Sequence, residues 1–312
     1  MADTDHSAEI ARKSAAIVDL TREIEEHRRA LGEQPGVSPF APASFPDLPP
    51  VPGVRFAAVS AGVRYTTGRL DVMLAELAEG SVMAGTFTRS GTRAAPVLWC
   101  EDRIAEISDK PGGERLAVLV NAGNANAFTG SNGMQAVEAA VTGAGDALGI
   151  SAKSVFMAST GVIGEPLPAD RITAKLSELV DGLDGNRIED AAEAIRTTDT
   201  FAKGASAQTS LDGETVTISG IAKGSGMIAP DMATMLVFVF TDAVISQSLL
   251  QSAVSSLTDQ TFNAITVDSD TSTSDTLLVG ATCQSSMPPL TLPDDARYPA
   301  FHDALRDVMQ DL

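Results

Sequence analysis

A threonine stands where a glycine-rich segment meets an apolar run. The segment begins at Lys223, continues Gly-Ser-Gly-Met-Ile-Ala-Pro-Asp-Met-Ala, and reaches Thr234 just before Met235–Phe240. A threonine hydroxyl is a weak nucleophile and needs an adjacent base. If the chain is cut between Ala233 and Thr234, the freed α-amine has an ordinary pKa of about 8 and becomes that base. Taken alone, the motif favours a simpler interpretation, in which Thr234 opens a strand, as β-branched residues often do.

The histidines exclude several other kinds of catalytic site. There are three, His6, His27 and His302, and all lie near the ends of the chain. A Ser-His-Asp triad, a Cys-His pair and a histidine-rich zinc site each need a central histidine. The two cysteines, Cys100 and Cys283, are too few for a disulfide framework and fit a reducing compartment.

An acidic loop follows a predicted strand near the C-terminal end. Asp268, Asp270 and Asp275 suggest a metal site, but Thr273 and Val279 stand where an EF-hand needs Gly and Glu. An Asp-x-Asp segment after a strand also occurs in aspartyl phosphotransferases. The favoured interpretation is structural, with carboxylates that cap turns and helix ends. We expect no metal.

Several ordered blocks of the sequence resemble one enzyme family. The segment 223–236 closely resembles the self-cleavage site of the ornithine acetyltransferase family, the bifunctional glutamate N-acetyltransferases of arginine synthesis. Further blocks continue this resemblance: Ala84-Gly-Thr-Phe-Thr-Arg89, Ala94-Ala-Pro-Val97, Asn121-Ala-Gly-Asn-Ala-Asn-Ala127, Ser159-Thr-Gly-Val-Ile-Gly164, Thr197-Thr-Asp-Thr200 and Thr266-Val-Asp-Ser-Asp-Thr-Ser-Thr-Ser-Asp275.

The resemblance implies a mechanism and a set of site residues. Cleavage between Ala233 and Thr234 leaves Thr234 as the N-terminal nucleophile, which takes acetyl from N-acetylornithine and passes it to glutamate in a ping-pong transfer. Thr160 and Gly161, expected in a turn after a strand, match the family's oxyanion hole. Lys223 and Thr197 match substrate-binding residues, with Thr198 an adjacent alternative to Thr197.

The resemblance also implies the fold, the assembly and the co-substrates. The fold is a layered, N-terminal-nucleophile-like α/β sandwich, and the α and β chains cut from one precursor form an α2β2 heterotetramer. No cofactor is implied, and acetyl-CoA is a second candidate acetyl donor. Family members continue beyond position 312 with further substrate contacts, so this chain resembles a member that lacks its C-terminal part. The alternatives are an N-terminal-nucleophile amidase or aminopeptidase, and an inactive truncated fragment.

Hydrophobic periodicity predicts the elements that must position these residues, and their mixture indicates layered α/β or α+β. The predicted strands are Val82–Thr88, Leu116–Val120, Val155–Ala158, Thr215–Ile221, Met235–Phe240, Ala264–Val267 and Leu277–Val279. The predicted helices are 8–31, 133–149 capped by Asn132, 172–183, Ile188–Ile195, Ser246–Thr258 and 299–312.

Composition limits the partners and sets the domain boundaries. The 312 residues hold 22 Lys and Arg against 41 Asp and Glu, a net charge of −19 that disfavours nucleic acid and anionic membranes as partners. With no apolar stretch long enough to span a bilayer, we expect a cytoplasmic protein. We expect an N-terminal helical extension (1–36), a proline-rich linker or strap (37–53), an α chain (54–233) and the start of a β chain (234–312).

Overall fold

The computed structural model describes residues 37–38, 41–65, 68–106, 113, 115–229 and 235–312. The chain divides into two compact units, Met1–Ala43 and Ser44–Leu312. In the first unit the Ala41 N–H donates to the carbonyl of Ser38 (3.0 Å). The helix predicted over 8–31 lies outside the described residues.

Two sheets form the centre of the second unit. The first has four strands, in the spatial order β1 (Val54–Val59), β2 (Val72–Leu77), β4 (Leu116–Asn124) and β5 (Val155–Val162). The second has five, in the order β3 (Val82–Phe87), β9 (Thr276–Ala281), β8 (Leu236–Thr241), β7 (Glu214–Lys223) and β6 (Lys203–Leu211). Each sheet contains one parallel pair, β4 with β5 and β8 with β9. A parallel pair needs a crossover connection, and helices α3 and α7 supply it.

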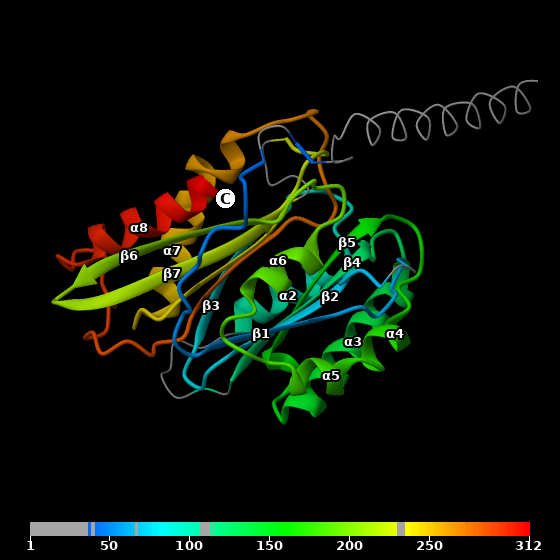
Figure 1. Cartoon of the computed structure of the whole chain (residues 1–312), viewed down its shortest axis with the longest axis horizontal. Coiled ribbons are helices and arrows are strands. Elements are labelled where there is room, and N and C mark those ends of the chain that lie inside the picture. The colour runs from blue at the N-terminus through cyan, green and yellow to red at the C-terminus, as the bar shows by residue number, and fades with distance from the viewer. Residues whose placement is uncertain (1–36, 39–40, 66–67, 107–112, 114, 230–234) are drawn as a thin grey trace, which may run out of the picture. The chain divides into compact units, whose positions relative to one another are not determined.

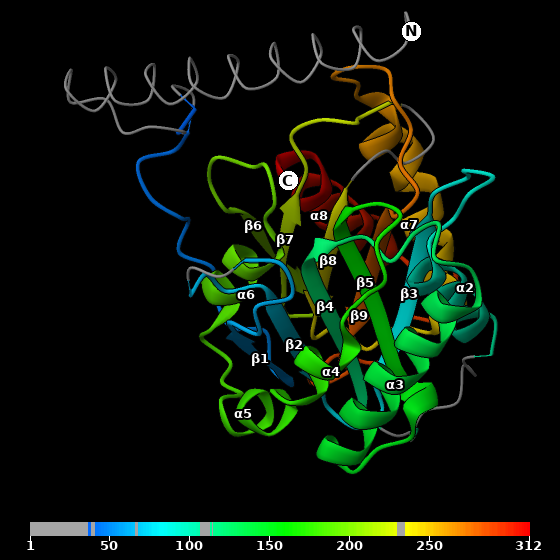
Figure 2. The ribbon, with the colours of Figure 1, turned by 90° about the vertical axis from the view of Figure 1, so that its right-hand side faces the viewer.

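Helices cover the outer face of each sheet, and others pack at the core between the sheets (Figures 1 and 2). The helices are α2 (Ala95–Glu106), α3 (Gly130–Leu148), α4 (Ala169–Thr173), α5 (Leu176–Asp181), α6 (Ile188–Ile195), α7 (Gln247–Gln260) and α8 (Tyr298–Asp311), with short 3-10 turns at Ala152–Ser154 and Phe262–Ala264. Helices α3, α4 and α5 pack on the outer face of the first sheet, and α7 and α8 on the outer face of the second. The order of layers is therefore helices, sheet, sheet, helices, with α6 packed in the core between the sheets.

The burial of strand β8 on both faces explains why its sequence is continuously apolar. Val237 and Val239 pack toward α7 and α8, whereas Phe238 and Phe240 enter the core between the two sheets. There the rings of Phe240 and Phe56 from β1 meet edge to face, with centroids 5.2 Å apart. A strand that is covered on both faces has no polar side to alternate with.

The proline-rich segment lies against this unit from Ser44 onward. Leu48 and Val51 are buried in the core between the sheets. The Ser219 hydroxyl donates to the carbonyl of Pro49 (3.0 Å), and the Thr282 hydroxyl donates to the carbonyl of Pro52 (2.7 Å). The segment packs as an extended strap. A proline has no backbone N–H to donate to a sheet, so a strap outside the hydrogen-bond ladders suits this sequence.

Several predicted elements are confirmed and three details are wrong. The strands from Val82, Leu116, Val155, Thr215, Met235 and Leu277 form, as do the helices from Ile188, Ser246 and 299. Helix α3 begins at Gly130, so Asn132 does not cap it. The helix predicted over 172–183 is divided into α4 and α5. No strand forms over Ala264–Val267, because Val267 and Thr266 instead bond to the carbonyl of Ile228.

No helix among the described residues is long and apolar enough to cross a membrane.

Candidate active site

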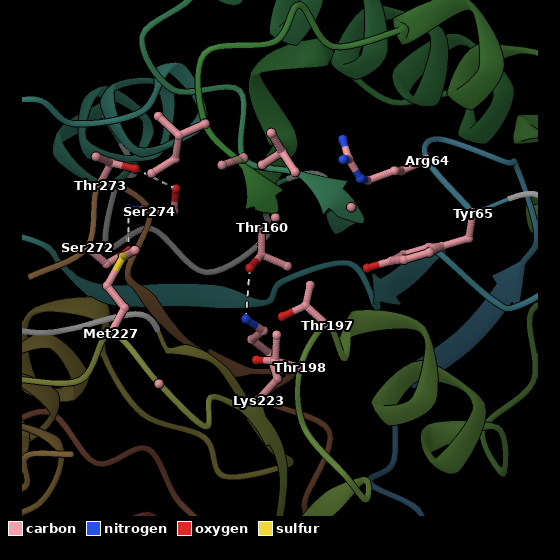
Figure 3. A pocket seen from close by; sticks show the side chains of 16 residues that line it. Arg64, Tyr65, Thr160, Thr197, Thr198, Lys223, Met227, Ser272, Thr273 and Ser274 are labelled. Carbon is pink, nitrogen blue, oxygen red and sulfur yellow. Dashed lines mark hydrogen bonds between the residues drawn. The ribbon is translucent and has the colours of Figure 1, made fainter. Parts of the chain in front are cut away.

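A cavity of about 380 Å³ opens where the ends of strands from both sheets meet. Figure 3 shows its lining. The lining residues are Arg64, Tyr65, Gly123, Ala125, Thr160, Gly161, Val162, Ile163, Thr197, Thr198, Lys223, Gly226, Met227, Ser272, Thr273 and Ser274. Four residues predicted from the sequence, Thr160, Gly161, Thr197 and Lys223, thus share one cavity although they are distant in the chain.

Thr160 and Gly161 lie in the last residues of β5, not in the turn after it. Gly161 pairs with Gly123 at the end of β4 and has φ of +132°, which disfavours any side chain. A Cβ on Gly161 would lie 2.3 Å from the backbone carbon of Gly123. Only glycine lets the two backbones approach so closely, and this approach fixes the position of Thr160 beside the cavity.

A hydrogen-bond network of neutral side chains supports the ends of β4 and β5 next to Thr160 and Gly161. The Ser159 hydroxyl donates to Asn121 Oδ1 (2.7 Å), and Asn121 Nδ2 donates to the carbonyl of Asn124 (2.9 Å). Asn124 Oδ1 accepts from the Asn126 N–H (2.8 Å). Asn121, Ser159 and Asn126 are almost fully buried. The amides of this segment therefore satisfy loop backbone, a common task of asparagine side chains.

Lys223 faces Thr160 from the other sheet. It is the last residue of β7, is 2% exposed, and donates from Nζ to Thr160 Oγ1 at 2.8 Å. Burial lowers the pKa of Lys223 to about 8, although the nearby carboxyl groups of Asp199 and Asp275 favour its charged form. The hydrogen bond joins the two sheets directly at the cavity, as the dashed line in Figure 3 marks.

Two buried carboxyl groups lie near Lys223. Asp199 Oδ1 accepts from Lys203 Nζ (2.5 Å) and from the Gly224 N–H (2.6 Å), and these partners outweigh burial and lower the pKa of Asp199. Asp275 is 0% exposed, and burial raises its pKa to about 8 against the opposing effects of the Met235 N–H, the Ser272 hydroxyl and Lys223. In each carboxyl group Oδ2 is buried, with no hydrogen-bond donor among the described residues.

Asp275 and its neighbour hold the start of β8. Asp275 Oδ1 accepts from the Met235 N–H (2.9 Å), and the Thr276 N–H donates to the carbonyl of Met235 (3.0 Å). Met235 follows Thr234 in the chain, whereas Ala233 and Thr234 themselves lie outside the described residues. The predicted cleavage site is thus followed immediately by a residue whose backbone is fixed on both sides.

Arg69 holds the segment that carries Thr197. Its guanidinium donates to the carbonyls of Arg196 and Thr197, the second at 3.5 Å, and stacks on the ring of Tyr65 (4.6 Å). Thr197 and Thr198 both line the cavity. The Thr198 hydroxyl is bonded to Ser225 Oγ (2.8 Å), while Figure 3 places Thr197 between Lys223 and Tyr65.

Arg64 and Tyr65 are cavity residues that sequence reasoning missed. They lie in the loop between β1 and β2, which the buried carboxylate of Asp71 holds by accepting from the N–H groups of Ala61 (2.6 Å) and Val63 (2.7 Å). A lone arginine-tyrosine pair in a loop gives no catalytic signal. A hint was available in Asp71, an acidic residue that directly precedes an apolar strand.

The acidic loop has a structural task. Asp268 accepts from the N–H groups of Met227 (2.5 Å) and Ile228 (2.8 Å), and these bonds lower its pKa. It thereby ties the acidic loop to the glycine-rich segment after Lys223. Among the described residues no group of three His, Cys, Asp or Glu side chains is arranged to hold a metal ion.

The chain is similar to a set of known proteins. The ArgJ family profile matches residues 55–312. The arginine biosynthesis bifunctional protein ArgJ of Ruegeria pomeroyi is 55% identical over 276 residues, which cover 88% of this chain and 65% of the relative. Its namesake from Nitrobacter winogradskyi is 50% identical over 279 residues, covering 88% and 66%. This chain therefore spans about two thirds of the length of these relatives.

A solved structure extends the similarity to the fold. The crystal structure of ArgJ from Bacillus halodurans matches with a TM-score of 0.51 and 32% identity, covering 60% of this chain and 92% of that chain. The layered α/β fold that the resemblance implied is confirmed. Because the family match begins in β1 and runs through both sheets to Leu312, the chain belongs to the ArgJ family.

Proposed function

We propose that this protein is a self-cleaving acetyltransferase that moves acetyl from N-acetylornithine to glutamate, with Thr234 as the nucleophile. The observation that carries the proposal is the hydrogen bond between Thr160 and Lys223 in the cavity that also holds Gly161 and Thr197. The matched ArgJ family, whose similar members are named as bifunctional proteins of arginine biosynthesis, supports a reaction in that pathway.

In the first half-reaction the Thr234 hydroxyl attacks the acetyl carbonyl of N-acetylornithine. Its proton passes to the Thr234 α-amine and then to the leaving amine, the amide C–N bond breaks, and ornithine departs. In the second half-reaction the neutral amine of glutamate attacks the acetyl ester, its proton passes through the Thr234 α-amine to the Thr234 oxygen, the C–O bond breaks, and N-acetylglutamate departs. The α-amine is the proposed base, and no histidine stands among the described residues that line the cavity.

Both half-reactions pass through tetrahedral oxyanions. Thr160 Oγ1 and the N–H of Gly161 are the proposed donors to that charge, and the glycine-packed end of β5 holds them in place before the reaction. Donors that are already oriented need no reorganisation when the charge develops.

The cavity also suits the charge of the substrates. N-acetylornithine and glutamate both carry an α-carboxylate, and Lys223 and Arg64, which also pairs with Glu165 (2.9 Å), supply positive charge to the lining in a chain of net charge −19. Thr197 is a proposed further substrate contact. No cofactor is needed for this chemistry, and acetyl-CoA is a proposed second donor of acetyl.

Cleavage defines the proposed chain organisation. Residues up to Ala233 form the α chain, with its globular part from 54, and Thr234 begins the β chain. We propose that two such pairs assemble as an α2β2 heterotetramer, as the resemblance implies.

The test begins with the intact mass and the N-terminal sequences of the freshly purified chain. We expect two fragments and a new N-terminus at Thr234. Thr234→Ala should abolish both cleavage and acetyl transfer. Thr215→Ala, at an exposed position of β7, is the matched control and should leave both unchanged. A cleaved and active Thr234→Ala variant would overturn the proposal.

A second measurement identifies the acceptor. Radiolabelled N-acetylornithine is mixed with the processed protein, with and without glutamate, and the products are separated. Labelled N-acetylglutamate is the expected product. Release of free acetate alone, whether or not glutamate is present, would instead identify an amidase or aminopeptidase.

A further inference from the structure

The contact between Lys223 and Thr160 has a direction that follows from chemistry. A charged ammonium group has three N–H donors and no acceptor. The 2.8 Å contact from Lys223 Nζ therefore makes Thr160 Oγ1 the acceptor. The hydroxyl proton of Thr160 must then point elsewhere, because it cannot be shared with a group that only donates.

We propose that Lys223 is a positioning residue that acts through Thr160: while charged, it forces the Thr160 hydroxyl to donate into the cavity, where an oxyanion is stabilised. This inference rests on the proposed function and extends it. It gives Lys223 a task on the protein itself, distinct from binding a substrate carboxylate.

The surroundings of Lys223 suit such a task. The residue is 2% exposed, so bulk water does not compete for its N–H groups. The carboxyl groups of Asp199, before β6, and Asp275, before β9, raise the pKa of Lys223. The positive charges of Lys203 of β6 and Arg69 before β2 lower it. Among the described residues the buried Oδ2 atoms of Asp199 and Asp275 accept no hydrogen bond, and both carboxyl groups favour the charged form of Lys223.

Deprotonation would reverse the hydrogen bond. A neutral amine is a good acceptor, so the Thr160 hydroxyl would turn to donate to Nζ and would be lost to the oxyanion. Because burial lowers the pKa of Lys223 to about 8, we expect this change in weakly alkaline solution. Catalysis should therefore rise with pH as the Thr234 α-amine loses its proton, and fall again as Lys223 loses its own.

The first test is a double-mutant cycle on the processed enzyme. Thr160→Ala should lower kcat by about 100-fold, the usual loss for an oxyanion donor. Lys223→Met should lower kcat by about 30-fold or more with KM changed by less than about threefold, and should have almost no further effect in the Thr160→Ala background. Lys153→Met, at a lysine that is 70% exposed, is the matched control.

The second test is the pH dependence of kcat. The wild-type protein should lose activity above a pH of about 8, and Lys223→Arg should keep activity there, because arginine remains a charged donor. If a variant matures slowly, the rate at which the Thr234 N-terminus appears replaces kcat. Attack on the Ala233 carbonyl develops the same kind of charge.

The outcomes separate this inference from the proposed function. The losses of kcat in the two single variants could multiply in the double variant, or Lys223→Met could raise KM and leave kcat unchanged. Either result would show that Lys223 only binds substrate. An alkaline loss that persists in Lys223→Arg would also contradict the inference. A wild-type chain that neither cleaves nor transfers acetyl would overturn the proposed function, and this inference with it.

Discussion

The two walls of the cavity are built by different physical means. On the β4–β5 side, Gly123 and Gly161 bring two backbones into contact, and a neutral network around Asn121 and Ser159 satisfies its own polar groups. On the β7–β8–β9 side, ionisable groups are buried, and Asp275 Oδ2 has no hydrogen-bond partner in the part of the chain that the structure describes.

The difference teaches where the site is adjustable. A wall held by steric contact and neutral hydrogen bonds has the same geometry at every ordinary pH. A wall held by buried acid and base groups changes with their protonation, because burial penalises the charged form of each. The β4–β5 wall is therefore suited to holding hydrogen-bond donors in fixed positions. The β7–β8–β9 wall is suited to steps that depend on protonation.

Gly161→Ala should produce the largest effect, because it breaks the steric wall. The added Cβ would overlap the backbone of Gly123, so we expect the free energy of unfolding to fall by about 3 kcal/mol or more and self-cleavage to be lost. Denaturant titration measures the first quantity and intact mass the second. Gly164→Ala, also at positive φ but in open space, should cost only about 1 kcal/mol. Equal losses in both variants would contradict the steric explanation.

Asp275→Asn tests whether the buried ionisable groups on the β7–β8–β9 side make stability depend on pH. Its folded pKa is raised to about 8 from 3.8, so the stabilisation it contributes is fully present below a pH of about 4 and is lost as pH rises toward 8. The wild type should therefore lose a few kcal/mol relative to Asp275→Asn between pH 5 and pH 8. Urea unfolding at the two pH values measures this. A stability difference that does not change with pH would refute it.

Ser159→Ala tests the neutral network. Removing the hydroxyl leaves the buried Asn121 Oδ1 without its donor, which should cost about 1–2 kcal/mol. The loss should be the same at pH 5 and pH 8, in contrast to Asp275→Asn. Ser210→Ala, at an exposed position of β6, serves as the control for the substitution itself.

Asp268→Asn should have the smallest effect. Its exposed carboxylate bonds to the N–H groups of Met227 and Ile228, so its loss should speed hydrogen exchange at these two amides several-fold while leaving the core unchanged. Asp270→Asn, in the same loop, is the control. Unchanged exchange at Met227 and Ile228 would show that the loop is held by other contacts.

The elements that pack on both faces could be predicted from the sequence. The apolar run at Met235–Phe240 became β8, and the helix predicted from Ser246 became α7, where the structure shows the Ser246 hydroxyl accepting from the Leu249 N–H. The strand predicted over Ala264–Val267 failed because its apolar residues are exposed: Ile265 is 44% exposed and Val267 is 62% exposed. Periodicity does not reveal whether an apolar side chain finds a partner.

The site residues also divide into those that the sequence identifies and those that it does not. Thr160, Gly161, Thr197 and Lys223 could be identified from blocks of sequence, and the structure brings them to one cavity. The opposing Arg64 and Tyr65 could not, because a buried carboxylate bonded to distant backbone amides places their loop. The roles assigned to all of these residues stay predictions until the variants are measured.

The strand order of the second sheet has a consequence for a chain cut before Thr234. Strands β8 and β9, which follow the cut, lie between β7 on one side and β3 on the other, both of which precede it. Each product would contribute alternate parts of one hydrogen-bonded sheet, so neither could leave without breaking two ladders. The fragments should therefore behave as interlocked halves of a split protein. Residues 1–233 and 234–312, produced together as separate polypeptides, should find each other and rebuild the sheet.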